Sequence, residues 1–129
     1  MTKTALPGNF RRIRLELARE PGHPGGDQHT GYVIVAPLDS DGRIDPKAAH
    51  EHRDACTVVR MRAGAEPEHG RLRRRPGGSW ALHYDFEGGR EDDDPGYRFD
   101  EHRFVTGEYV TVMEDAGAHT YRIAAVQAL

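Results

Sequence analysis

Two kinds of metal ligand are concentrated in one stretch of the chain, APLDSDGRIDPKAAHEHRDAC, which spans residues 36–56. Calcium-binding loops supply oxygen ligands from positions 1, 3, 5, 7, 9 and 12 and carry glycine at position 6. With Gly42 at position 6, the carboxylates of Asp39, Asp41 and Asp45 stand at positions 3, 5 and 9. A proline and an alanine occupy positions 1 and 12, so both terminal ligands are absent. The segment is therefore predicted to be a polar turn that leads to a helix N-cap at Asp45.

The second kind of ligand is the pair His52 and Cys56, which would lie one turn apart on the same face of a helix. His50 lies about 200° from His52 around the helix axis and cannot join them. Structural zinc sites take four ligands, and the spacings of the other histidines match no ligand pattern. The sequence therefore predicts no metal and no cofactor, with His52 and Cys56 as the candidates if a metal binds.

A histidine and a carboxylate stand two residues apart at His83 and Asp85, the pairing from which many general bases are built. On a strand such partners lie roughly 7 Å apart, too far for a direct hydrogen bond. The chain has no GxSxG nucleophile motif, no GxxxxGK[ST] loop and no strand–GxGxxG–helix unit. A non-enzymatic protein with an exposed polar face at His83 and Asp85 is therefore favoured, and an enzyme that uses them as a base is the alternative.

The basic segment RLRRRP favours binding, because Arg71, Arg73 and Arg75 would project from one face of a strand. Small barrels bind single-stranded nucleic acid with such strands and with stacking aromatic residues, for which Trp80 and Tyr84 are nearest in sequence. Both alternate with other apolar residues, which favours a place in the core, and an acidic run follows shortly after. These five residues are the binding candidates, with nucleic acid as the less favoured partner.

The length of 129 residues fits one domain, with the N-terminal residues 1–8 flexible. Net charge is -3 and the isoelectric point is near 6.2, so no overall field attracts nucleic acid or an anionic membrane. A single cysteine excludes an internal disulfide, and no stretch reaches the roughly 18–20 apolar residues of a membrane helix. An arginine pair precedes any apolar stretch of signal length. Together these features predict a cytoplasmic protein without membrane contact.

Period-two apolar spacing predicts strands for most segments of the chain. The expected strands are FRRIRLELARE from residue 10, YVIVAPL at 32–38, TVVRM at 57–61, RLRRRP at 71–76, SWALHYDF at 79–86, and EYVTVMED and HTYRIAAVQAL toward the C-terminus. Pro46 after an Asp N-cap predicts one helix to about residue 55. Residues 19–31 and 87–96, rich in Gly, Pro or acidic residues, are predicted to be mobile loops.

Short strands joined by Gly/Pro turns predict a mainly β fold, a small antiparallel β-barrel or sandwich of seven to eight strands with one short peripheral α-helix. A barrel is favoured because closing the sheet removes its edges. On the strongest strand, Trp80, Leu82, Tyr84 and Phe86 share one face and are expected to point inward.

The segments FRRIRLELAREPGHPGG, YVIVAPLDSDGRID, HRDAC, RPGGSWALHYDF and GEYVTV…HTYRI, in this order, resemble a group of short bacterial proteins of unknown function, found mostly in alphaproteobacteria. The resemblance implies a stand-alone bacterial domain and assigns no activity to any residue. With long polar loops on a tight framework, the expected function is a non-enzymatic binding module for a protein or small-molecule partner.

Overall fold

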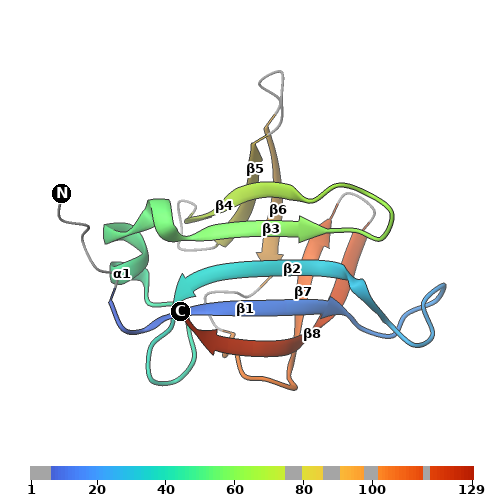
Figure 1. Cartoon of the computed structure of the whole chain (residues 1–129), viewed down its shortest axis with the longest axis horizontal. Helices are drawn as coiled ribbons and strands as arrows, with labels where there is room; N and C mark the ends of the chain where they lie inside the picture. Colours follow the sequence, from blue (N-terminus) through green and yellow to red (C-terminus); the bar gives the residue numbers. More distant parts are fainter. Residues whose placement is uncertain (1–6, 75–79, 86–90, 98–101, 115–116) are drawn as a thin grey trace.

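The computed structural model describes residues 7–74, 80–85, 91–97, 102–114 and 117–129, with the backbone alone for residues 85 and 91–97. In these ranges eight antiparallel strands follow one another around a closed barrel, and β8 pairs with β1 to complete it (Figure 1). The strands are β1 (Phe10–Leu17), β2 (Asp27–Pro37), β3 (Thr57–Met61), β4 (Glu68–Arg74), β5 (Trp80–Asp85), β6 (Glu91–Tyr97), β7 (Tyr109–Glu114) and β8 (Gly117–Ala128). The predicted mainly β barrel is confirmed.

The predicted turn and N-cap are also confirmed between β2 and the helix. One carboxylate oxygen of Asp39 accepts hydrogen bonds from the backbone N–H groups of Asp41 and Arg43, at 2.9 and 3.0 Å. Asp45 then caps α1 (Pro46–Glu51) by accepting from the N–H of the second and third helical residues. The carboxylates that resemble calcium ligands are therefore used to fold the turn.

The helix is shorter than the predicted span of residues 46–55. Regular α-helix ends at Glu51, and a 3-10 helix, η1 (Arg53–Ala55), continues the chain into β3. Ala48 and Ala49 are the buried residues of α1. Because the apolar side of the helix is so small, α1 lies at one end of the barrel, as Figure 1 shows, and forms only the margin of the core.

The inward face of β5 follows the predicted alternation. Trp80, Leu82 and Tyr84 are 5%, 0% and 1% exposed, while Phe86 lies outside the described residues. The opposite face differs from the prediction, because His83 is only 4% exposed. The exposed polar face expected at His83 is therefore wrong, since β5 is covered on both sides in this small barrel.

Two predicted loops are partly strands. Residues 91–97 form β6, paired with β5 from Trp80↔Gly96 to Asp85↔Glu91, although 87–96 was expected to be a loop. Residues 27–31, in the expected loop 19–31, begin β2. Without β6, one edge of β5 would leave its N–H and C=O groups unpaired, and this need for pairing outweighs the weak strand propensity of Asp, Gly and Pro.

Two strand glycines allow neighbouring backbones to approach closely. A Cβ added at Gly70 in β4 would lie 2.0 Å from the carbonyl oxygen of His83, and one at Gly31 in β2 would lie 1.8 Å from that of Leu15. Both contacts are with backbone atoms of the adjacent strand, which cannot rotate away as a side chain could. Glycine at these positions is therefore a requirement of the curved sheet.

We expect Gly70→Ala to lower the free energy of unfolding by about 3 kcal/mol, the upper part of the range for overpacked sites. Urea denaturation followed by circular dichroism measures the change. Gly25→Ala is the matched control, because nothing lies within 4 Å of an added Cβ there. Equal urea midpoints for Gly70→Ala and Gly25→Ala would show that β4 and β5 can move apart to accommodate a methyl group without loss of stability.

Neither α1 nor any other helix among the described residues has the length and apolar content of a membrane-spanning segment.

Candidate binding site

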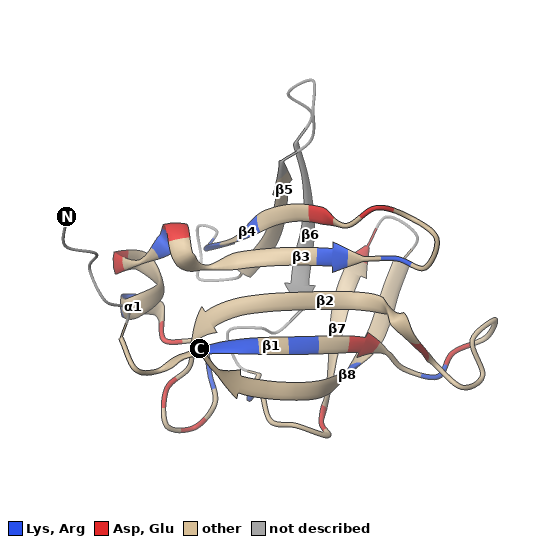
Figure 2. Cartoon of the chain, viewed as in Figure 1, with Lys and Arg blue, Asp and Glu red and all other residues tan. Residues whose placement is uncertain are grey.

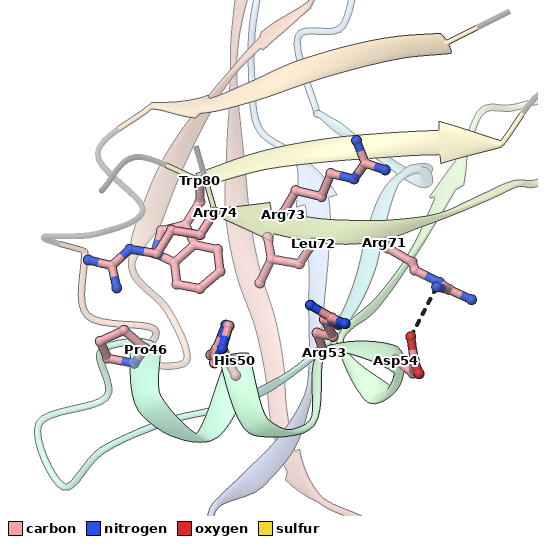
Figure 3. A pocket seen from close by; sticks show the side chains of 10 residues that line it. Pro46, His50, Arg53, Asp54, Arg71, Leu72, Arg73, Arg74 and Trp80 are labelled. Atoms are coloured by element: carbon pink, nitrogen blue, oxygen red, sulfur yellow. Dashed lines mark hydrogen bonds and ion pairs between the residues drawn. The ribbon is translucent and has the colours of Figure 1, made fainter. Parts of the chain in front are cut away.

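A cavity of about 500 Å³ lies between the helical segment α1–η1 and the strands β4 and β5. Figure 3 shows the side chains that line it, which come from both sides of this gap. The lining residues are Pro46, Ala49, His50, Arg53, Asp54, Arg71, Leu72, Arg73, Arg74 and Trp80. Three of the five predicted binding candidates, Arg71, Arg73 and Trp80, are thus brought to one place.

Positive charge dominates the lining. Four arginines and one aspartate are among the lining residues, and Figure 3 shows the guanidinium group of Arg73 directed away from the helical segment. In Figure 2 basic residues are seen at the end of β4 beside the helical segment. The carboxylate of Asp54 binds Arg71 at 3.1 Å, and both side chains are largely exposed. Among the described residues, no carboxylate pairs with Arg53 or Arg74. The cavity therefore has cationic groups available for an anionic ligand.

The interior of the cavity is apolar. Leu72 and Trp80 are 4% and 5% exposed, and Ala49 is buried on the facing side of α1. Figure 3 shows Leu72 and Trp80 directed toward α1, with His50 opposite them. The guanidinium carbon of Arg74 lies 6.0 Å from the centre of the indole ring, a cation–π contact that holds this arginine beside the cavity.

Strand register explains why the cavity receives residues from both faces of β4. Leu72 and Arg74 pair with Leu82 and Trp80 on the inward face, whereas Arg71 and Arg73 pair with the opposite face of β5. The inward face becomes accessible only at this end of the strand, where α1 leaves a gap. Period two in the sequence predicts the two faces of β4, but not the contribution of α1–η1.

The prediction of a stacking platform for nucleic acid has no counterpart in this geometry. Tyr84 is 1% exposed and Trp80 5%, so neither ring presents a face at the surface. Arg71 and Arg73 are exposed on β4, and Arg75 lies outside the described residues. The two aromatic candidates are core residues, as their alternation favoured.

His83 and Asp85 were predicted as a possible general base and its carboxylate partner, and the described residues do not form such a site around them. His83 is buried on β5, in register with Arg71 on β4 and Asp93 on β6, and it does not line the cavity. The side chain of Asp85 lies outside what the structure describes. The imidazole is therefore not among the groups that a ligand in the cavity would contact.

The metal candidates His52 and Cys56 lie at the junction of α1 and the barrel. The ring of His52 packs edge-on against Phe10, with 5.9 Å between ring centres. The Cys56 thiol faces the carbonyl oxygens of Ala49 and His52, at 3.9 and 3.7 Å, and burial raises its pKa to about 11. A thiol held in this way is a poor thiolate ligand at neutral pH. Among the described residues, no group of three or more His, Cys, Asp or Glu side chains is placed to hold a metal ion.

A charged cluster that the sequence reading missed fills the opposite end of the barrel. The Glu114 carboxylate accepts hydrogen bonds from the hydroxyls of Tyr32, at 2.6 Å, and Tyr121, and from the Arg60 guanidinium at 3.1 Å. Arg60 also lies 3.9 Å from Glu68. The side chains of Arg60 and Glu114 are only 10% and 11% exposed. The sequence offers a signal for the inward direction of Arg60 and Glu114. Each lies two residues along its strand from a fully buried valine, Val58 or Val112, and therefore on the same face of the strand.

Burial of the two tyrosines is the main cause that raises the pKa of each hydroxyl, and the Glu114 carboxylate raises both further. Both hydroxyls therefore stay protonated and remain donors to the carboxylate. This cluster holds β2, β3, β7 and β8 together at the end of the barrel that α1 does not cover.

Comparisons with protein-family models, with curated proteins and with solved structures found no match to this chain.

Proposed function

We propose that this protein is a non-enzymatic binding module that takes a small anionic molecule into the cavity between α1–η1 and β4–β5. The observation that carries the proposal is the lining itself, in which Arg53, Arg71 and Arg74 stand around apolar side chains and Asp54 is the one carboxylate. Guanidinium groups form charge-assisted hydrogen bonds with carboxylates and phosphates, and a nearby apolar wall strengthens them by excluding water.

The dimensions favour a small molecule over a polymer. Ligand cavities commonly enclose about 300–1,000 Å³, and this one encloses about 500 Å³. Binding to single-stranded nucleic acid through Arg71 and Arg73 is less supported, because the aromatic rings that would stack with bases are buried. The cytoplasm is the proposed location, on the sequence features alone.

The proposal predicts saturable binding of simple organic anions, read from tryptophan fluorescence. Trp80 is the only tryptophan of the chain and lines the cavity, so its emission reports on occupancy. We expect phenyl phosphate and octanoate to change this emission, and the double variant Arg53→Ala, Arg74→Ala to weaken both by about tenfold, the loss of one charged hydrogen bond. Raised salt should weaken binding as well, because the guanidinium groups at the rim are exposed.

Arg62→Ala is the matched control, since Arg62 is exposed between β3 and β4 and does not line the cavity. This variant should bind both anions as the unmodified protein does. If neither anion binds, or if the two variants lose affinity equally, the cavity is not an anion site.

A further inference from the structure

The cavity is an elongated trough, and one face of the helical segment forms its whole length. Pro46, Ala49 and His50 line it from one face of α1, and Arg53 lines it from η1. The trough therefore runs from the start of α1 to η1.

β4 lies along the same trough, antiparallel to the helical segment, and one ion pair fixes their relative position. Arg71 binds Asp54 of η1, so the middle of β4 lies over η1. Arg74 is three residues further along β4, which corresponds to roughly 10 Å on a strand. Figure 3 accordingly shows Arg74 near Pro46 and Arg53 toward the other end, with Trp80, Leu72 and His50 between them.

Charge and apolarity are therefore separated along the trough. Arg74 stands at the α1 end, held over the indole of Trp80. At the η1 end Arg53 is the available cation, because Asp54 already binds Arg71. Leu72, Ala49 and Trp80 form the apolar middle, and each is less than a tenth exposed. A ligand with one anionic group could satisfy only one end.

We infer that the ligand is an elongated dianion, two anionic groups joined by an apolar spacer, bound with one group at Arg74 and the other at Arg53. This inference rests on the proposed function and names the ligand class of the same cavity. An α,ω-dicarboxylate is the simplest molecule of this class. The apolar spacer lies against Leu72 and Trp80, where water would otherwise be poorly accommodated.

The test compares octanedioate with octanoate, which share a chain length and differ in one carboxylate. Fluorescence titration of the unmodified protein should give a dissociation constant for octanedioate about tenfold lower than for octanoate, the effect of one additional charged hydrogen bond. Arg74→Ala and Arg53→Ala should each remove this preference, leaving the two ligands equal. Arg62→Ala should retain it.

The outcomes separate the two proposals. If octanoate binds as tightly as octanedioate and Arg53→Ala weakens both, the cavity is an anion site but the dianion assignment is wrong. If octanedioate is preferred and Arg74→Ala leaves the preference intact, the second group does not lie at Arg74, and the assignment is also overturned. If neither octanoate nor octanedioate binds, the proposed function itself fails.

Discussion

Replacing Glu114 by alanine is expected to lower the free energy of unfolding by about 3–5 kcal/mol, the range for removing one partner of a buried ion pair. The carboxylate accepts three hydrogen bonds, from Arg60, Tyr32 and Tyr121. Its loss removes the carboxylate that lies 3.1 Å from a guanidinium that is only 10% exposed. Urea denaturation measures the difference.

Two further variants define the cause. Glu66→Ala removes an exposed glutamate from the β3–β4 connection and should change stability by less than about 0.5 kcal/mol. Glu114→Gln should recover part of the loss, because the amide oxygen can still accept hydrogen bonds from the two tyrosine hydroxyls. A loss below about 1 kcal/mol for Glu114→Ala would mean that water already solvates this end of the barrel.

Trp80→Ala is expected to cost about 3–5 kcal/mol, the range for truncating a large buried aromatic residue. The indole is 5% exposed and belongs to the barrel core, beside the neighbouring buried residues Leu72 and Leu82. This change also alters the cavity. The free energy of unfolding is therefore measured by urea denaturation in the absence of ligand, so that ligand binding does not contribute to it.

The matched control is Tyr109→Ala on β7, where the residue is 57% exposed. Surface substitutions of this kind change stability by about 0.5 kcal/mol or less. If the two variants are equally stable, the indole contributes no packing to the core.

Local patterns predicted the fold well and the candidate site in part. Period two placed Trp80, Leu82 and Tyr84 inside, and the Asp45–Pro46 pair marked the helix start. The same rules predicted a loop at residues 91–97, because local composition does not show that β5 needs a strand to pair with its free edge. For the same reason His83 was expected at the surface, although β5 is covered on both faces.

The cavity shows a further limit of sequence reading. Arg71, Arg73 and Trp80 were found as binding candidates because they are close together in the sequence. Arg53, His50 and Pro46 were not associated with them, since the contact between η1 and β4 joins residues 17 positions apart. Arg74 lies on the opposite face of β4 from Arg71 and Arg73, and the gap beneath α1 makes that face accessible.

The amino-acid sequence alone determined the strands with regular apolar alternation, the polar turn at residues 39–45 and the choice of a small β fold, because these depend on interactions between near neighbours. Tertiary structure decided that the sheet closes through β1 and β8, that β6 is a strand, and that Glu114 meets Arg60, 54 positions away. It also brought α1–η1 over the end of β4 to form the cavity. Such contacts depend on how the curled sheet returns on itself, and spacing along the chain carries no record of that geometry.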